Sequence, residues 1–548
     1  MKKMLINYTV KGESFTCEGL ESSHFFIEEK EDGCRKTMYL NAEEPLTIQK
    51  FQIVYPYKFN KDNRVFVNGY QSWTDSREYF IDEEMSELSR FTEFYVKTPF
   101  VQKIGIGKSG DYFICKYPRR KGLFYGWSYG YVRTNGRIDL FGSLSERCGF
   151  TIVRFDAENQ QVIIEKELEG VTFSGRTLIA DYAIITDVYE AAFDKYFDLM
   201  GVRCSQKEKK CGYTTWYNYY GSITEDIVVR DLEALSKLDE KVDIFQIDDG
   251  YQKAIGDWLE TKADKFPNGM KKIADEIHKK DMLAGLWLAP LAVTANSSVY
   301  KEHKDWLIRD KKGKPYVAGP NWGPFYALDI YNKGAADYIR HFFDVILNEW
   351  GYDMVKLDFL YAACVLPIHN KTRGEVMCDA MDLIRDCVGD KIILGCGVPL
   401  MPAFGKVDFC RIGADVDLEW IRRKHRIRED VSTPNTVNCT VFRRHLNGRA
   451  FLNDPDVFLL RDTNTKMSFD QRALLAKING CFGSLLFVSD NVEDYKDNQM
   501  KVFLDTIKKK DIKILNAEFT EKNIIAVNCT IDGREESFRF NSETGESC

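Results

Sequence analysis

The sequence predicts a multidomain α/β protein: a central (β/α)8 TIM barrel, an N-terminal antiparallel β-sandwich and a small C-terminal antiparallel β domain. Three observations support this. The 548 residues exceed the size of one ordinary domain. Strands and helices alternate through the middle of the chain, and short strands with turn signals lie on both sides of it. The predicted domains are residues 1–204, 205–512 and 513–548.

The first 185 residues or so read as all-β. Runs of alternating apolar and polar residues recur, and Asn-Gly turn signals at 68–69 and 135–136 separate some of them. The clearest runs are Phe51–Tyr55, Tyr112–Tyr117, Thr151–Phe155 and Gln161–Ile164. The pattern then becomes helical over about 187–201, and the charged run 205–210 is interpreted as a linker.

One polar loop in this region, Asn68–Trp73, carries a tryptophan. A tryptophan in such a turn either packs its face at a corner of the fold or contacts a ligand, and the loop alone does not decide between the two.

After the linker, eight strands are predicted, with helices between most of them. The strands are 213–219, 242–248, 283–289, 354–360, 392–396, 409–413, 450–453 and 484–489; the helices are 226–238, 270–280, 335–349, 374–388 and 470–481. The interval between the fifth and sixth strands has little room for a helix. No Gly-rich dinucleotide turn or P-loop is present, so a closed barrel is favoured over an open doubly wound sheet. Beyond 513 the alternation returns, with a hairpin signal at Asp532-Gly533.

Composition excludes several classes of function. The net charge is −7 without a long basic block, so neither nucleic acid nor an anionic membrane is expected as a partner. No signal peptide or membrane-spanning segment is expected. The 15 cysteines include no C-x-x-C pair and the seven histidines no H-E-x-x-H motif, which predicts reduced thiols, a cytoplasmic location, no zinc site and no cofactor. Aromatic residues make up 13%, a richness that sugar-binding clefts and large cores share.

Lys356 and Asp358 lie two positions apart in the fourth predicted strand, so they share one face. Each could neutralise the other as a structural ion pair at a strand end. The alternative is a catalytic carboxylate with a neighbouring cation, because catalytic groups of a barrel lie at the C-terminal ends of its strands.

The other predicted strand ends are rich in carboxylates. The polar residues there are Asp248, Asp249, Arg411, Asp415, Asp454, Asp456 and Asp490. Such a set suits either a divalent metal or glycoside hydrolysis, which needs a carboxylate and a carboxylic acid on either side of the bond. Lys356 and Arg411 argue against a metal, since each would repel it. Strand-end ion pairs and loop caps remain the plain alternative.

Several motifs in order resemble the α-galactosidases of glycoside hydrolase family 36, in particular the compact, monomeric bacterial form. They are the Gln71-Ser72-Trp73 loop, Phe245–Tyr251, Gly256-Asp257-Trp258, Lys265-Phe266-Pro267, Gly285-Leu286-Trp287, Lys356-Leu357-Asp358, Leu394–Leu400, Arg411–Asp415 and Leu452–Asp456. The chain departs from the wider family in having Trp287-Leu288-Ala289-Pro290 for W-x-E-P and Arg411-x-x-x-Asp415 for W-x-S-D.

The resemblance implies a retaining hydrolase that removes terminal α-galactosyl residues from small galactosides such as melibiose or raffinose. It implies Asp358 as nucleophile and Asp415 as general acid/base, with Asp417 as the rival for the second role. About 5–5.5 Å would separate the two carboxyl groups.

The resemblance also implies substrate contacts. Asp248 and Asp249 would accept hydrogen bonds from the 4- and 6-hydroxyls, which requires the chain to turn there. Lys356 would bind the 3- and 4-hydroxyls, and Arg411 and Cys396 would lie near the 2-position. Trp287 and Trp73 would form walls, although core packing is an equal reading for Trp287. Asp257 is either a second contact or a structural cap, and Asp454 and Asp456 are interpreted as structural.

Three alternatives stay open: an α-N-acetylgalactosaminidase, a galactosyl transferase, and a carbohydrate-binding protein without catalysis.

Overall fold

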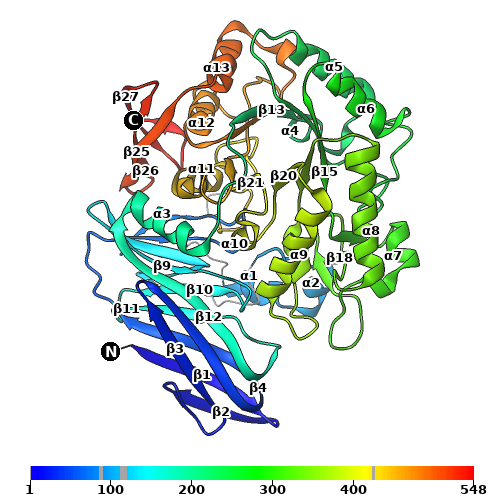
Figure 1. Cartoon of the computed structure of the whole chain (residues 1–548). Coiled ribbons are helices and arrows are strands. Elements are labelled where there is room, and N and C mark those ends of the chain that lie inside the picture. Colours follow the sequence, from blue (N-terminus) through cyan, green and yellow to red (C-terminus); the bar gives the residue numbers. More distant parts are fainter. Residues whose placement is uncertain (1, 86–89, 111–119, 423–425) are drawn as a thin grey trace.

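The computed structural model describes residues 2–85, 90–110, 120–422 and 426–548. Figure 1 shows the N-terminal strands, in blue and cyan, beside a ring of strands and helices, with the last strands, in red, next to α12 and on the same side of the view as the N-terminal strands. The predicted barrel and the flanking antiparallel sheets are confirmed. The predicted domain limits stay a prediction.

The N-terminal region is a sandwich built from one antiparallel sheet that folds over itself. β4 is shared between the layers: its first half pairs with β3 and its second half with β1 and β11. Phe141 of β9 and Phe155 of β10 are not on neighbouring strands, yet their ring centroids lie 6.0 Å apart, so the two strands face each other across the core. The strands are β1 Lys3–Val10, β2 Glu13–Glu18, β3 Phe25–Asp32, β4 Arg35–Pro56, β5 Arg64–Val67, β6 Arg77–Phe80, β7 Leu123–Trp127, β8 Tyr129–Thr134, β9 Arg137–Ser143, β10 Thr151–Asp156, β11 Gln161–Lys166 and β12 Thr172–Val188.

The central parallel sheet closes into a barrel. Its order is β22-β21-β20-β19-β15-β14-β13-β24-β23, and β22 and β23 are two parts of one segment interrupted at Pro455-Asp456. Residue 454 pairs with β21 while residue 457 pairs with β24, and the Ser484 N–H donates to the Asn453 carbonyl at 2.9 Å. The strands are β13 Lys210–Thr214, β14 Ile244–Ile247, β15 Leu283–Leu288, β19 Met354–Leu357, β20 Ile392–Gly395, β21 Phe409–Arg411, β22 Leu452–Asp454, β23 Val457–Phe458 and β24 Leu485–Val488.

Helices cover the outside of this barrel, and several begin at a side-chain cap. Thr224, Ser297, Asn332, Thr372 and Ser468 each accept a hydrogen bond from the first turn of the helix that follows. The helices are α3 Tyr189–Met200, α4 Trp216–Tyr219, α5 Glu225–Ser236, α6 Gly269–His278, α7 Ser298–Glu302, α8 Lys333–Asp344, α9 Arg373–Val388, α10 Leu400–Ala403, α11 Thr433–Phe442, α12 Phe469–Phe482 and α13 Asp497–Ile507. No helix within the described residues is both long and apolar enough to cross a membrane.

Smaller elements complete the fold. A three-stranded sheet follows the third barrel strand, two short helices lie in the N-terminal region, and a C-terminal sheet ends the chain. They are β16 Ala292–Thr294, β17 Val317–Gly319, β18 Phe325–Ala327, α1 Arg90–Val96, α2 Pro99–Ile104, β25 Ile512–Glu521, β26 Ile524–Ile531, β27 Arg534–Asn541 and β28 Glu546–Ser547. The predicted hairpin at Asp532-Gly533 is confirmed, with φ of 50° and 78°.

Some limits of strands and turns that were predicted from the sequence differ from those in the structure. The first barrel strand was predicted over 213–219 but ends at Thr214, and Trp216–Tyr219 are helical, because the chain turns away at the barrel mouth. Asn68-Gly69 does not form a tight hairpin turn; it begins a loop over 68–76 between the paired strands β5 and β6. The predicted run Tyr112–Tyr117 lies outside the described residues. The missing helix between strands five and six is confirmed, since only the single turn α10 lies there.

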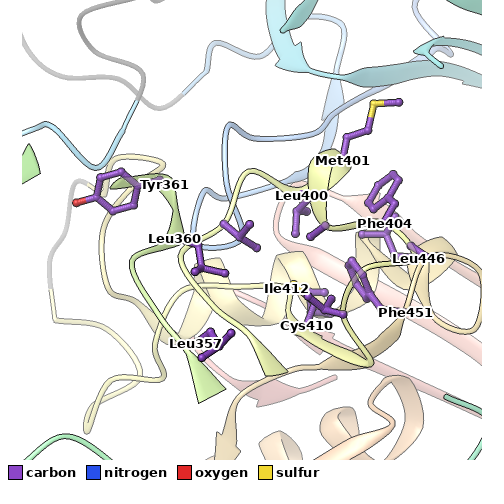
Figure 2. Close-up of a cluster of buried hydrophobic side chains, with 14 of the residues drawn as sticks. Leu357, Leu360, Tyr361, Leu400, Met401, Phe404, Cys410, Ile412, Leu446 and Phe451 are labelled. Atoms are coloured by element: carbon purple, nitrogen blue, oxygen red, sulfur yellow. The ribbon is translucent and has the colours of Figure 1, made fainter. Parts of the chain in front are cut away.

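The loops at the strand ends rest on a buried apolar cluster (Figure 2). It joins the end of β19 to the segments after β20 and β21 and to residues 446–451, and the labelled members include Leu357, Leu360, Leu400, Ile412 and Phe451. Each of these side chains is 1% exposed or less. Their close packing limits movement of the loops that carry polar side chains at this end of the barrel.

A buried arginine docks the N-terminal loop 68–76 onto the barrel. Arg443 follows α11 and donates to the side chain of Asn68 at 3.0 Å, to the carbonyls of Gln71 and Ser72 at 3.1 and 2.8 Å, and to the carbonyl of Ile412 at 2.8 Å. These bonds satisfy the guanidinium while it is fully buried. The sandwich and the barrel are therefore joined at the loop that precedes Trp73.

Arg443→Met is expected to lower the free energy of unfolding by about 3 kcal/mol or more, because it leaves several buried acceptors unsatisfied. Urea unfolding followed by tryptophan fluorescence measures this. Arg422→Met, at a side chain 64% exposed, is the control, with an expected change within about 0.5 kcal/mol. Equal stabilities of the two variants would contradict the docking role.

Candidate active site

The C-terminal ends of the barrel strands surround a cavity of about 210 Å³. Most of the predicted site residues line it: Trp73, Asp248, Asp249, Trp287, Lys356, Asp358 and Asp415. They come from β14, β15, β19, the segment after β21, and the N-terminal loop. The parallel strands bring them together because all their C-terminal ends meet at one mouth.

Lys356 forms a buried ion pair with Asp248, not with Asp358. The distance between Lys356 Nζ and Asp248 Oδ2 is 2.7 Å, and both side chains are less than 10% exposed. The idea that Lys356 and Asp358 neutralise each other at the strand end is therefore wrong. Burial alone lowers the pKa of Lys356, but the carboxylate of Asp248 is the main influence in the other direction, and the net pKa is raised.

The carboxylate of Asp358 is fixed by two donors. Trp287 Nε1 donates to Oδ2 at 3.1 Å, and the backbone N–H of Phe359 donates to Oδ1 at 2.8 Å. Phe359 has a φ of 54°, a left-handed conformation that a bulky residue rarely adopts and that turns the chain directly after the carboxylate. Trp287 is thus both packed in the barrel and part of the cavity wall.

Burial is the largest influence on Asp358 and raises its pKa above the ordinary range. The charge of Lys356 and the hydrogen bond from Trp287 lower it, and the charge of Asp415 raises it. Asp358 and Asp415 line the same cavity.

Position 397, next to the turn at Phe359, requires glycine. Gly397 has a φ of 54°, and a Cβ there would lie 2.8 Å from the ring of Trp73 and 2.9 Å from the nitrogen of Phe359. The Gly397 carbonyl accepts from the N–H of Tyr361 at 2.8 Å. The Cys396-Gly397 motif thus lets the loops after β19 and β20 and the N-terminal loop approach closely.

Asp248 and Asp249 both reach the cavity because β14 ends at Ile247 and the chain turns there, as the sequence argument required. Asp248 Oδ2 also accepts from Gln246 Nε2 at 3.1 Å. Asp249 accepts from Gln252 Nε2 at 2.6 Å and from Trp322 Nε1 at 3.0 Å. Burial raises the pKa of Asp249, and these two hydrogen bonds lower it in part.

Arg411 is surrounded by three carboxylates. Its Nη1 lies 2.7 Å from Asp415 Oδ1, its Nη2 lies 2.6 Å from Asp456 Oδ1, and its Nε lies 3.5 Å from Asp454 Oδ2. Asp456 also accepts from Tyr217 Oη at 2.5 Å and from the N–H of Val416 at 2.7 Å. Of these four charged side chains, Asp415 lines the cavity and is 37% exposed. Asp454 and Asp456 act as the structural support that was expected.

Two predicted contacts lie behind the cavity wall. Among the described residues, Arg411 and Cys396 are not part of the cavity lining. Cys396 Sγ accepts from Trp73 Nε1 at 3.3 Å, so it positions the tryptophan. Direct contacts of Arg411 and Cys396 with a ligand stay predictions.

Two further predicted candidates, Asp417 and Asp257, are not among the described residues that line the cavity. Asp417 Oδ1 accepts from the N–H of Leu418 at 2.7 Å. Asp257 accepts from the N–H groups of Ser298 and Val299 at 2.8 and 3.2 Å, so it caps the start of α7.

Seven lining residues were not predicted as site residues from the sequence: Trp216, Asn321, Trp322, Phe359, Ala414, Glu429 and Val431. Trp216 would have been found had the first strand been ended at Thr214. In the sequence, Trp322 lies between β17 and β18 and does not follow a barrel strand. In the structure, its ring centroid lies 4.6 Å from that of Phe359. Glu429 accepts from Thr74 Oγ1 at 2.6 Å. The sequences around Asn321, Trp322, Glu429 and Val431 carry no signal that these residues lie at the end of a barrel strand.

The described residues contain no group of three or more His, Cys, Asp or Glu side chains arranged to hold a metal ion. The cavity combines two carboxylates, a buried lysine–aspartate pair and tryptophan side chains. Paired carboxylates at the mouth of a (β/α)8 barrel are a chemistry that glycoside hydrolysis uses.

Comparison with known proteins narrows the class of protein. Residues 195–372 match the Melibiase family model. The α-galactosidase of Escherichia coli is 26% identical over 270 residues, which are 46% of this chain and 34% of that protein. The A type blood α-D-galactosamine galactosaminidase of Flavonifractor plautii is 30% identical over 162 residues, covering 28% and 15%. The matches span about a third or less of these two relatives' own length.

The fold comparison covers nearly the whole chain. The solved α-galactosidase of Thermus thermophilus has a TM-score of 0.72 at 23% identity, covering 97% of this chain and 98% of that one. Residues 195–372 are therefore similar to a melibiase domain, and the overall fold is similar to that of the solved α-galactosidase of Thermus thermophilus.

Asp257→Ala is expected to lower the free energy of unfolding by about 1 kcal/mol, because the first two N–H groups of α7 lose their acceptor. Asp257→Asn keeps an acceptor oxygen and should cost less. Urea unfolding of both variants measures the difference. An alanine variant as stable as the wild type would return Asp257 to the list of ligand contacts.

Proposed function

We propose that the protein is a retaining, exo-acting α-galactosidase that removes terminal α-D-galactosyl residues from small galactosides of the melibiose and raffinose type. The observation that carries this is the placement of Asp358 and Asp415 in one cavity beside the buried Lys356–Asp248 pair. A cavity of about 210 Å³ suits one hexose and not a chain that passes through, which supports exo action. The Thermus thermophilus neighbour is a complex with p-nitrophenyl α-D-galactopyranoside.

In the first step, the ionised carboxylate of Asp358 attacks the anomeric carbon while Asp415 donates a proton to the leaving oxygen. Trp287 and the Phe359 N–H hold Asp358, so little reorientation is needed. A covalent galactosyl-enzyme forms and the aglycone alcohol departs. In the second step, Asp415 removes a proton from water, which displaces Asp358 and releases galactose.

Arg411, the ion-pair partner of Asp415, allows Asp415 to gain and lose a proton during the reaction. Arg411 contacts Asp415 at 2.7 Å but is shared with Asp454 and Asp456. When Asp415 takes up a proton, Arg411 therefore still contacts Asp454 and Asp456 and is not left without a partner.

Recognition of galactose would rest on the polar side of the cavity. Asp248 and Asp249 would accept hydrogen bonds from the 4- and 6-hydroxyls, and Lys356 would donate to the 3- and 4-hydroxyls. Lys356 is held ionised by Asp248, so it can donate without shifting the charge of the site. Trp287, Trp73 and Trp322 offer faces or edges to the apolar side of the ring.

A second candidate is an α-galactosaminide-cleaving enzyme, favoured by the galactosaminidase relative. Rates on p-nitrophenyl α-galactoside and p-nitrophenyl α-N-acetylgalactosaminide separate the two. Added acceptor sugar reveals any transfer of the galactosyl group. Faster cleavage of the acetamido substrate would replace the first candidate with the second.

We also propose that the enzyme works as a monomer in the cytoplasm. The described cysteines are all free thiols, which suits a reducing compartment. The monomer is supported by the resemblance to the compact bacterial form.

Asp358→Gly is expected to reduce kcat on p-nitrophenyl α-galactoside by on the order of 10⁴-fold or more, because the nucleophile is lost. Azide should restore turnover by entering the space of the carboxylate and yield a galactosyl azide. Asp417→Asn is the control, with activity within about tenfold of the wild type, since Asp417 is not among the described residues that line the cavity. Unchanged activity of Asp358→Gly would reject the proposed function; binding without turnover in the wild type would support the non-enzymatic alternative.

The acidic limb of the pH profile of kcat/KM should shift when Trp287 is replaced. The nucleophile reacts in its ionised form, so kcat/KM falls as the pH drops through the pKa of Asp358. Trp287→Phe removes a hydrogen bond that lowers this pKa, so the limb should move to higher pH by about half to one unit. Trp322→Phe, which loses a bond to Asp249 instead, should leave the limb in place. A limb that stays or moves to lower pH in Trp287→Phe would contradict the assignment of Asp358.

A further inference from the structure

A second, larger cavity of about 950 Å³ lies at the opposite end of the barrel from the candidate active site. It is bounded by the start of β13, by α12 and α13, and by the segment that leads into β25. Figure 1 shows α12 and α13 next to the C-terminal strands in this region. The catalytic residues follow the C-terminal ends of the strands, whereas Lys210 begins β13, so the two cavities are separate.

Lysine dominates the charge of this cavity. Eight lysines line it against four carboxylates, although the whole chain has a net charge of −7. Three of the lysines have carboxylates within 4 Å. The other five have none among the described residues: Lys209, Lys241, Lys501, Lys508 and Lys509. These five come from three separate segments of the chain, at residue 209, at residue 241 and at α13 with its C-terminal end, so the fold gathers them.

Lys209 differs from an ordinary surface lysine. Its side chain is partly buried, and burial lowers its pKa, with only partial compensation from Cys481 and Asp511. A bound anion would relieve this cost of desolvation. The charge of the cavity is therefore complementary to a multivalent anion.

The cavity also has an apolar part, which we call its floor. It consists of Phe469, Ala473 and Ala476 of α12, Val502 and Ile507 of α13, and Leu486 of β24. An inorganic anion needs no such surface. An apolar floor with an ammonium-rich rim suits a molecule with an apolar or aromatic body and a highly charged end.

We propose that this cavity binds a small organic phosphate of about nucleotide size, with the phosphates on the lysines and the body on the apolar floor. Ammonium groups act as point charges for phosphate oxygens. The volume lies in the range of about 300–1,000 Å³ that small-molecule sites occupy. The confined shape and the negative charge of the whole chain favour a small ligand over a nucleic acid.

Isothermal titration calorimetry on the full chain at low salt tests this, with ATP, adenosine and inorganic pyrophosphate as probes. ATP is expected to bind once per chain, pyrophosphate at least about tenfold more weakly, and adenosine not measurably. Raising the salt concentration should weaken ATP binding, because exposed lysine charges are screened. Equal affinities of ATP and pyrophosphate would overturn the role of the apolar floor.

Two double variants locate the site. Lys241→Gln with Lys501→Gln, and separately Lys508→Gln with Lys509→Gln, should each weaken ATP binding by about tenfold or more; these lysines are exposed, so folding is preserved. Lys195→Gln with Lys311→Gln, at exposed positions away from the cavity, is the matched control and should leave the affinity unchanged. No binding of ATP to the wild type, or an equal loss in the control, would overturn the proposal. Turnover of galactosides plays no part in the measurement, so its outcome is independent of the proposed function.

Discussion

The buried ion pair between Lys356 and Asp248 is the constraint on which the candidate site depends. Neither charge could remain in the barrel mouth alone, since an uncompensated buried charge costs several kcal/mol. Their 2.7 Å contact joins β19 to the end of β14. Within the described part of the chain it also leaves Asp358 without a direct salt bridge, so that the indole of Trp287 and one backbone N–H hold that carboxylate instead. A nucleophile tied to a lysine by a salt bridge would be a poorer one, because the bridge would have to break during attack.

The N-terminal sandwich is part of the same arrangement. Arg443 fixes the loop that carries Trp73, and Trp73 in turn donates to Cys396 and packs on Phe359, with ring centroids 5.1 Å apart. Phe359 supplies the N–H that binds Asp358. A change in the docking of the sandwich is thereby connected to the proposed nucleophile through three consecutive contacts. We infer that the sandwich contributes to the geometry of the site as well as to stability.

Much of the fold could be predicted because it depends on local patterns. The alternation of strands and helices, the short interval before β21 and the Asp532-Gly533 hairpin all follow from spacing and turn chemistry. The placement of Asp248, Asp249, Asp358 and Asp415 at one mouth followed from the barrel rule. The partner of Lys356 could not be predicted, because a shared strand face pointed to Asp358, whereas the true partner is 108 residues earlier in the chain. Trp322 and Glu429 were missed for a related reason: they reach the cavity from loops whose path no periodicity encodes.

The central claim is that Asp358 becomes covalently bonded to galactose. The most direct test is to trap this intermediate with a fluorinated galactosyl fluoride, whose second step is slow, and to locate the label by peptide mass spectrometry. The account predicts one galactosyl unit per chain on the peptide that contains Asp358. A label on another carboxylate, or inverted product with no trapped species, would contradict it.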